Sequence, residues 1–222
     1  MTTFTVTNLN DSGAGSLRAA ILASNADQSP TADRIEFAVS GTITLLSDLP
    51  AITNTVQIDA KTAPSYVPGG PPVVEVNFNG HSGLTFSTGS SGSGLFGLAL
   101  GNSGDNGVTL NASNVTVDKN YIGIHANGSA FSNALDGVYV SSLSSDNKIG
   151  LNDSHASGVV GNVISANGRN GIALHGSDDN VIVANRIGTS PDGSAAMANG
   201  HNGILVTEGA DGNTIGGTVF VD

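Results

Sequence analysis

The sequence contains no cysteine and no tryptophan, and aromatic and charged residues make up only 5% and 11% of it. Without cysteine the chain can form no disulfide, zinc–thiolate site or thiol nucleophile. Seven Lys and Arg stand against 18 Asp and Glu, a net charge of −11, which excludes the clustered basic patch that nucleic acids and anionic membranes require. No apolar run approaches the roughly 20 residues of a membrane span.

What the chain does contain is a short phrase that returns four times in its second half, a turn dipeptide followed by apolar residues two apart. The four copies are Asn106-Gly107-Val108-Thr109-Leu110, Asp136-Gly137-Val138-Tyr139-Val140, Asn170-Gly171-Ile172-Ala173-Leu174 and Asn202-Gly203-Ile204-Leu205-Val206. They recur at intervals of 30, 34 and 32 residues. Self-similarity at such a period is the signature of stacked repeats.

Alternation along each copy predicts short strands with one apolar face. Such strands cannot form a core alone, but stacked about 4.8 Å apart in parallel sheets they share one apolar column. We therefore predict an all-β, right-handed, single-stranded parallel β-helix. The inward column is expected to comprise Val108, Leu110, Val138, Val140, Ile172, Leu174, Ile204 and Val206. An alternating α/β repeat is the rival fold, but the intervals lack a helical apolar pattern.

A second phrase follows each copy of the first and is expected to keep step with it. It reads Asn120-Tyr121-Ile122-Gly123, Asn147-Lys148-Ile149-Gly150, Asn185-Arg186-Ile187-Gly188 and Asn213-Thr214-Ile215-Gly216. Asparagine tolerates left-handed backbone and its amide can bond to neighbouring backbone groups. Recurrent asparagines therefore predict corners that bond from one turn of the solenoid to the next.

One helix is predicted, over residues 16–26, with Ser16 as its N-cap and Leu17, Ala20, Ile21 and Ser24 on one side. Because the first turn of a β-helix leaves unpaired strands and an open apolar end, the helix is expected to cap it. The chain is read as a single domain over residues 1–222. Residues 1–34 form the first strand and the cap helix, and residues 35–222 form the stacked turns.

The N-terminal residues resemble the signature of bacterial "C-S-L-R-E-A-I" domain proteins. The resemblance rests on Val6-Thr7-Asn8, Asn10-Asp11-Ser12-Gly13 and Gly15-Ser16-Leu17-Arg18-Ala19-Ala20-Ile21, and on residues 33–37, 41–45 and 49–60. Gly15 stands for the family's Cys and Ala19 for its Glu. The resemblance implies a right-handed β-helix in large secreted or surface-anchored, adhesin-like exoproteins, and it implies no catalytic residues.

Several segments are expected to leave the stack as loops. The first is residues 61–72, which contain Pro64, Pro68, Pro71 and Pro72. The insertions 125–135, 151–157 and 189–201 are predicted to fall on one side of the solenoid. Residues 159–167 are read as an additional pair of short strands. Loops on a rigid scaffold are common binding surfaces.

An enzyme acting on polysaccharide is the alternative function, because such sites lie on outward strand faces of parallel β-helices. A lyase or epimerase needs a base, usually Lys or Arg, beside a calcium ion held by carboxylates, and a hydrolase needs two carboxylates facing one cleft. The candidate catalytic residues are His175, Asp178, Asp179 and Arg186. Asp178 and Asp179 are also the candidate calcium ligands, and Asp153 and Asp192 are further loop acids. The five histidines show no zinc spacing.

The sequence favours a non-catalytic structural or adhesive module over this enzyme, because no aligned columns bring an acid, a base and a charge stabiliser together. The expected partner is a polysaccharide or another cell-surface ligand. No cofactor is expected, with calcium the one metal left open. The expected setting is secreted or on the bacterial cell surface, as a monomer or as part of a longer chain.

Overall fold

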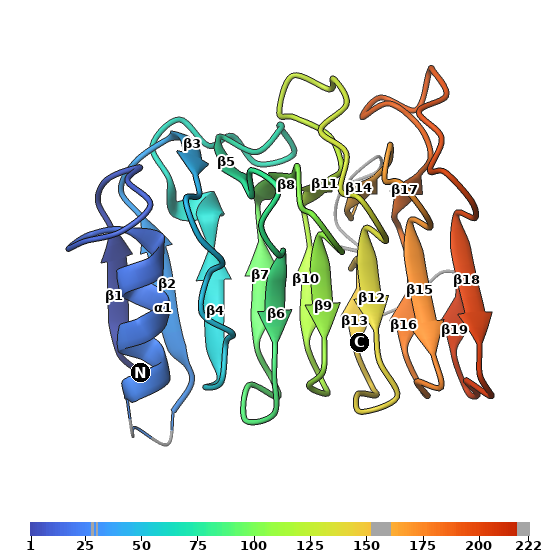
Figure 1. Cartoon of the computed structure of the whole chain (residues 1–222), viewed down its shortest axis with the longest axis horizontal. Coiled ribbons are helices and arrows are strands. Elements are labelled where there is room, and N and C mark those ends of the chain that lie inside the picture. The colour runs from blue at the N-terminus through green and yellow to red at the C-terminus, as the bar shows by residue number, and fades with distance from the viewer. Residues whose placement is uncertain (28, 30, 152–160, 217–222) are drawn as a thin grey trace.

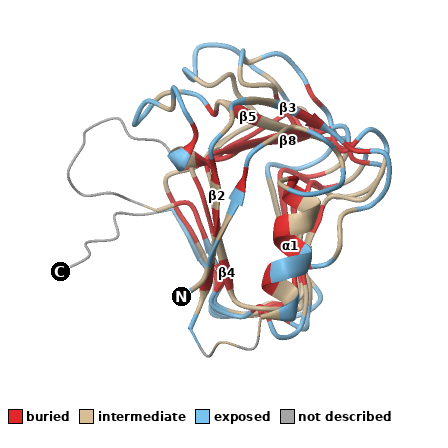
Figure 2. Cartoon of the chain, turned by 90° about the vertical axis from the view of Figure 1, so that its left-hand side faces the viewer, coloured by how far each residue is buried: buried red, intermediate tan, exposed pale blue. Residues whose placement is uncertain are grey.

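The computed structural model describes residues 1–216 except 28, 30 and 152–160, and its strands form three parallel sheets (Figure 1). From β4 onward the chain passes through sheets A, B and C in turn, so each of these turns of the solenoid adds one strand to each sheet. This confirms the predicted parallel β-helix. Figure 2 shows the sheets enclosing a common buried interior.

The strands are short, and their bounds follow sheet by sheet. Sheet A contains β1 (Thr3–Val6), β2 (Asp33–Phe37), β4 (Val56–Asp59), β7 (Gly94–Phe96), β10 (Thr116–Asp118), β13 (Lys148–Ile149), β16 (Val181–Ile182) and β19 (Thr214–Ile215). Sheet B contains β3 (Gly41–Thr44), β5 (Val74–Asn77), β8 (Leu98–Gly101), β11 (Tyr121–Ile122), β14 (Val163–Ile164) and β17 (Arg186–Ile187). Sheet C contains β6 (Leu84–Phe86), β9 (Val108–Leu110), β12 (Val138–Val140), β15 (Ile172–His175) and β18 (Ile204–Thr207).

The register of sheet C is the one that the first repeated phrase predicts. Val108, Val138, Ile172 and Ile204 pair in one row, and Leu110, Val140, Leu174 and Val206 pair in the next. The members from β9, β12 and β15 are fully buried. Ile204 is partly buried and packs against the core, whereas Val206 is 42% exposed. Both belong to β18, the terminal strand of sheet C in the described residues.

The second phrase does not keep step with the first, and here the prediction is wrong. Asn120-Tyr121-Ile122 and Asn185-Arg186-Ile187 lead into strands of sheet B, whereas Asn147-Lys148-Ile149 and Asn213-Thr214-Ile215 lead into strands of sheet A. Asn-x-Ile is thus the entry to two different sheets, because both need the same corner and the same inward aliphatic residue. Of the predicted strand pair in residues 159–167, the structure describes β14, while residues 152–160 and most of the insertion 151–157 lie outside the described residues.

Asparagine side chains, with one aspartate among them, connect successive turns at the corners in four ladders, and most of these residues are buried. Their members are Asn106, Asp136, Asn170 and Asn202 before sheet C; Asn147, Asn180 and Asn213 before sheet A; Asn120, Asn162 and Asn185 between sheets A and B; and Asn133, Asn167 and Asn199 between sheets B and C. In each ladder a side-chain oxygen accepts from a residue of the adjacent turn. These bonds satisfy corner amides that the sheets leave unpaired.

The helix α1 (Leu17–Ala26) has the predicted cap and the predicted buried face. Ser16 is its N-cap and accepts from the amide of Ala19. Leu17, Ala20, Ile21 and Ser24 are buried, and the first three belong to the main core. Figure 2 shows α1 opposite β2 and β4. The helix therefore closes one side of the first turn, at the N-terminal end of the core.

Polar contacts fix the helix to its neighbours. The Asn25 side chain donates to Ala51 O and accepts from the amide of Thr53, and Ser24 Oγ donates to the buried carboxylate of Asp33 on β2. The same carboxylate lies 3.3 Å from Asn54 Nδ2. Within the described part of the chain, no helix has the length and apolar character that crossing a bilayer demands.

The helix contact can be tested with two aspartates at adjacent positions. Ile21→Asp places an unpaired carboxylate in the core and is expected to cost about 3–5 kcal/mol of unfolding free energy. Leu22→Asp is the matched control, because Leu22 is 52% exposed and its replacement should change stability little. Equal urea midpoints for the two variants would contradict the capping role.

The ladders give a second test at Asn162. Its Nδ2 donates to Val117 O and Asn185 Oδ1, and its Oδ1 accepts from the amide of Asn120. Asn162→Leu leaves these buried groups unpaired, so we expect a loss of about 2–4 kcal/mol in a denaturation series. Asn10→Ala, at an exposed position, should leave the midpoint within error of the parent. A small loss at Asn162 would show that the ladder contributes little.

Candidate functional site

Three of the loops predicted to leave the stack meet at one pocket of about 460 Å³. Loop 61–72 contributes Pro71, the loop after β11 contributes Ala126, Asn127 and Gly128, and the loop after β17 contributes Ser190, Pro191, Asp192, Ser194 and Ala195. Tyr121 completes the lining. The loops after β11 and β17 rise above the stack in Figure 1. The prediction that the insertions lie on one side is confirmed for these described loops.

Tyr121 occupies the centre of an outward column on sheet B. The column runs Glu75, Ala99, Tyr121, Val163, Arg186, one residue from each successive strand. Ala99 and Val163 are almost fully buried, although neither belongs to the main core. Burial raises the pKa of the Tyr121 hydroxyl, against the opposing effect of Arg186. The phenol therefore stays protonated at neutral pH and forms the floor of the pocket.

Glu75, two turns before Tyr121, anchors the loop after β11. Its Oε1 accepts from the amide of Ala126 at 2.8 Å, and its Oε2 lies 3.2 Å from Nδ1 of His125. The His125 ring stacks on Phe131 with the ring centroids 3.8 Å apart. A bridge between Ile124 and Ala130 closes the base of this hairpin. The Glu75 carboxylate on sheet B thus holds this hairpin to the sheet through its contacts with Ala126 and His125.

Arg186, two turns after Tyr121, anchors the loop after β17. Its Nη1 donates to the carbonyl of Pro191, and a bridge between Thr189 and Ala196 closes the base of the hairpin. The hairpins approach each other where Gly128 faces Pro191; a Cβ at Gly128 would lie 3.4 Å from the proline ring. Gly128 also has a positive φ of 83°, so the turn itself favours glycine.

Asp192 is the one charged residue of the pocket lining. Its carboxylate accepts from Ser190 Oγ, the Ser194 amide and Ser194 Oγ, and these bonds hold its pKa well below the usual range. The group is therefore ionised at any physiological pH, with its oxygens engaged inside its own turn. It forms part of the loop structure and is not placed to exchange a proton with a ligand.

The sequence-predicted site residues lie apart from one another. His175 projects outward from β15 of sheet C, and Arg186 belongs to β17 of sheet B. Asp178 and Asp179 lie in the turn between β15 and β16, where Asp178 Oδ1 accepts from the amide of Asp211 and Asp179 adopts a φ of 56°. The turn role suggested by their sequence context is what they perform. Of the four, Arg186 alone is part of the pocket's support.

The described residues contain no group of three or more His, Asp or Glu side chains that could hold a metal ion. The histidine contacts with acids are pairs, His81 with Asp48, His125 with Glu75 and His175 with Glu208. Asp178 and Asp179 therefore form no calcium site with a third acid in this part of the chain. His155 and Asp153 lie outside the described residues.

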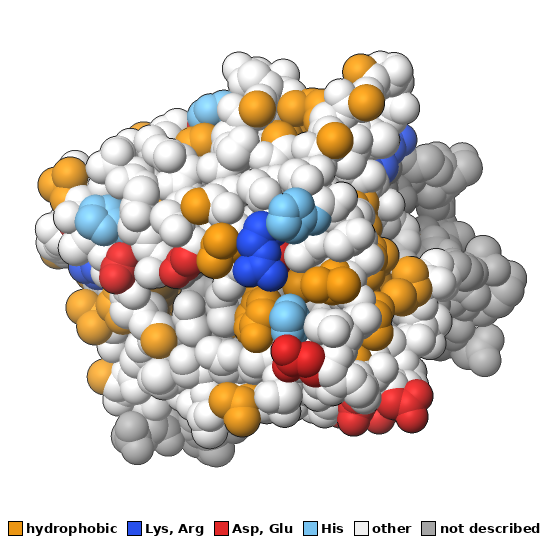
Figure 3. All heavy atoms as spheres, turned by 45° about the vertical axis from the view of Figure 1, so that its right-hand side comes forward, with side chains coloured by type: hydrophobic (Ala, Val, Ile, Leu, Met, Phe, Trp, Pro, Cys, Tyr) orange, Lys and Arg blue, Asp and Glu red, His pale blue; other side chains and the backbone are white. Residues whose placement is uncertain are grey.

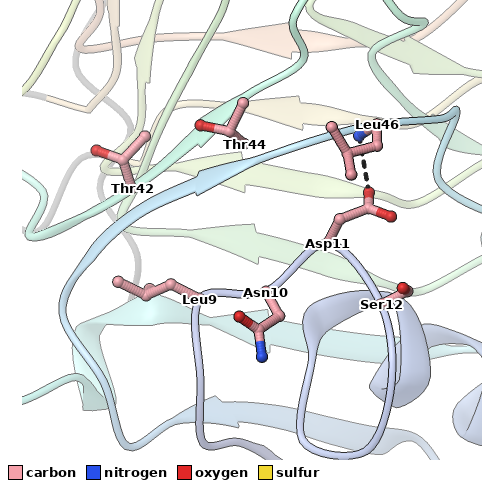
Figure 4. Close-up of a pocket in the computed structure, with 7 residues that line it drawn as sticks. All are labelled: Leu9, Asn10, Asp11, Ser12, Thr42, Thr44 and Leu46. Carbon is pink, nitrogen blue, oxygen red and sulfur yellow. Dashed lines mark hydrogen bonds between the residues drawn. The ribbon is translucent and has the colours of Figure 1, made fainter.

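A second hollow of about 420 Å³ lies between loop 9–12 and the strand β3, lined by Leu9, Asn10, Asp11, Ser12, Thr42, Thr44 and Leu46 (Figure 4). Asp11 Oδ1 accepts from the amide of Leu46, as the dashed line shows, and also pairs with Arg18 at 2.6 Å. Although burial opposes ionisation, these partners hold the pKa of Asp11 below its usual value. The Asp11 carboxylate thus links Arg18 of α1 to the backbone at Leu46.

Tyr121 and Glu75 are the residues that sequence reasoning missed. Their relation becomes visible once Glu75, Ala99 and Tyr121 are aligned turn by turn, which requires knowing that the turns differ in length.

The anchoring role of Arg186 has its own test. Arg186→Ala should speed hydrogen exchange in residues 189–196 while the unfolding midpoint changes little. Lys148→Ala, on an exposed lysine of sheet A, is the charge-matched control. Unaltered exchange in the Arg186 variant would contradict the anchor.

Comparison with known proteins adds a family. No curated protein matches the sequence. A family described as "Periplasmic copper-binding protein (NosD)" matches residues 54–222, about three quarters of the 222-residue chain. The matched region includes every strand from β4 onward, and with it the loop pocket and all four ladders. The chain therefore belongs to the NosD family.

Proposed function

We propose that this chain is a non-catalytic recognition module that binds a glycan in the loop pocket. The observation that carries the proposal is the convergence of three insertion loops over Tyr121, with the two hairpins anchored on either side of it by Glu75 and Arg186. Building and fixing two loops around one half-buried aromatic ring costs conformational entropy without adding to the core. A binding role accounts for that cost.

The pocket lining suits a sugar. The Tyr121 ring, Pro71 and Pro191 offer flat or rigid apolar surfaces for the C–H face of a pyranose, and Asn127, Ser190 and Ser194 add amide and hydroxyl groups at the rim. Hydroxyl-rich ligands are recognised by such a combination of an aromatic platform and a few polar groups. The lining contains the anionic Asp192 and no cationic side chain, and this combination disfavours an anionic ligand.

The pocket's chemistry supports binding rather than turnover. Cleavage of a glycosidic bond needs two carboxyl groups facing one site, and lyase chemistry needs a base beside a charge stabiliser. Asp192 is alone among the lining residues and already accepts several hydrogen bonds. The lyase, hydrolase or epimerase alternative finds no such pair in this pocket.

The family description supports a position outside the cytoplasm, since it names a periplasmic protein. The resemblance of residues 6–21 to the signature of bacterial exoproteins agrees with that setting. An acidic, cysteine-free solenoid is independent of disulfide formation. We place the module in the periplasm or at the cell surface, where polysaccharides are available to it.

Copper binding is not carried over from the family description. Copper sites in proteins use imidazole, thiolate and thioether ligands. The chain has no cysteine and two methionines; His81, His125 and His175 each meet a single carboxylate, and no group of three metal-ligating His, Asp or Glu side chains occurs among the described residues. The described residues thus do not fit a copper site, and no step of the proposed function uses the metal.

Glycan binding is testable by titration calorimetry and protein-observed NMR. The intact chain is expected to bind a member of a panel of β-glucan, xylan, mannan and chitin oligosaccharides, with shifts at residues 126–128 and 190–195. Tyr121→Ala should weaken this binding by about tenfold or more, and Tyr121→Phe should preserve it. Failure of every oligosaccharide to shift these residues would refute the proposal. New reducing ends or unsaturated sugars would favour the enzyme instead.

A further inference from the structure

The outward face of sheet C carries a second group of aromatic and polar side chains. Thr85, Thr109, Tyr139, Ala173 and Leu205 are in register along it. The Tyr139 ring lies tilted against His175, with centroids 5.0 Å apart. Figure 3 turns this side of the molecule forward and shows a basic side chain and histidines gathered over hydrophobic ones. Tyr139 is the large aromatic residue in a column otherwise made of threonine, alanine and leucine.

Beside this face, Asp136 breaks the pattern of its asparagine ladder. Asn202 donates both its backbone amide and its Nδ2 to Asn170 Oδ1, and Asn170 donates both groups to Asp136 Oδ1. Asp136 donates only its backbone amide to Asn106, because a carboxylate has no N–H. An asparagine at position 136 would supply the missing donor. The aspartate therefore lacks a bond that its neighbours in the ladder make.

The cost of this aspartate extends to its second oxygen. Asp136 is fully buried, and its Oδ2 has no hydrogen-bond partner among the described residues. The Arg169 guanidinium compensates the charge from 3.7 Å, beyond hydrogen-bonding distance. Leaving a buried acceptor unbonded is unfavourable. Where a protein departs from a locally better residue, a functional use is the expected reason.

His175 presents a second unpartnered acceptor on the same face. Its Nδ1 lies 3.3 Å from Glu208 Oε1, which favours a proton on Nδ1 and leaves the lone pair on Nε2. Nε2 is buried and has no hydrogen-bond partner in the described structure. Asp136 Oδ2 and His175 Nε2 therefore both require donors, while Arg169, 38% exposed, offers N–H groups at the surface.

We propose that this face of sheet C is a second binding site, for a neutral oligosaccharide lying along the strands across Tyr139. Hydroxyl groups can donate to Asp136 Oδ2 and His175 Nε2 and also accept from Arg169, a combination that a purely anionic or cationic ligand cannot meet. Arg169 screens Oδ2, and its exposure allows the guanidinium to shift as a hydroxyl enters. The C–H face of a sugar ring would pack on Tyr139.

The spacing of these groups calls for more than one sugar. Tyr139 lies three positions after Asp136, and His175 lies one residue beyond the Val140–Leu174 pair. At about 3.3 Å per residue the strip from Asp136 to the level of His175 measures about 16 Å. The strip belongs to sheet C and the loop pocket to sheet B, so binding at one site can be tested and rejected independently of binding at the other.

Asp136→Asn gives the decisive comparison, because it is expected to preserve or raise stability while it weakens binding. The variant supplies the missing ladder donor and removes a buried charge, so its melting temperature should equal or exceed the parent's. Its affinity for the neutral oligosaccharide bound at Tyr139 should fall about tenfold. A merely structural aspartate would leave that affinity unchanged, and this outcome would overturn the proposal.

Calorimetry with short β-glucan, xylan, mannan and chitin oligosaccharides, and with polygalacturonate and alginate fragments, completes the test. Tyr139→Ala should weaken binding of the neutral ligand about tenfold, while Thr109→Ala, the register partner one turn away, should not. To separate the two sites, binding should be measured in a Tyr121→Ala background and should persist there. Binding that Tyr121→Ala abolishes, binding of anionic fragments alone, or no binding in that background would each refute the sheet C site.

Discussion

The fold depends on side-chain amides that bond from one turn of the solenoid to the next. Parallel strands of two to five residues pair well along their length, but the corners between them leave backbone amides without partners. Asn120, Asn162 and Asn185 satisfy such amides at one corner, and Asn133, Asn167 and Asn199 do so at another. Because each asparagine bonds to the adjacent turn, the corners stack in register and the aliphatic columns between them close.

The loop pocket uses that register. Glu75 and Arg186 lie two turns on either side of Tyr121 in one outward column, and each holds a hairpin by a backbone group. Position along the column sets the separation of the two hairpins, so the pocket's width follows from the spacing of strands. On sheet C, in contrast, the groups proposed to bind are spread along the strands, so their separation follows from the rise per residue.

Much of the fold could be predicted from the sequence, because apolar alternation and Asn-Gly corners are local signals. The buried face of α1 and the rows of sheet C follow from spacing alone. The prediction that the Asn-x-Ile phrases keep step with the first phrase failed, because Asn147 and Asn185 begin similar local patterns in different sheets. The pocket was out of reach for a related reason. Glu75 and Tyr121 are 46 positions apart, and turns of unequal length hide their common column.

The placement of the hairpins has a consequence for how such a chain can diversify. Both leave the stack between sheets B and C, and each is bracketed by ladder asparagines, Asn120 and Asn133 for one, Asn185 and Asn199 for the other. The intervening turn, with Asn162 and Asn167, passes the same corner in a short connection. The brackets keep the register whether the segment between them is long or short. Segments at this corner can therefore lengthen, shorten or be exchanged during evolution while the stack beneath them stays the same.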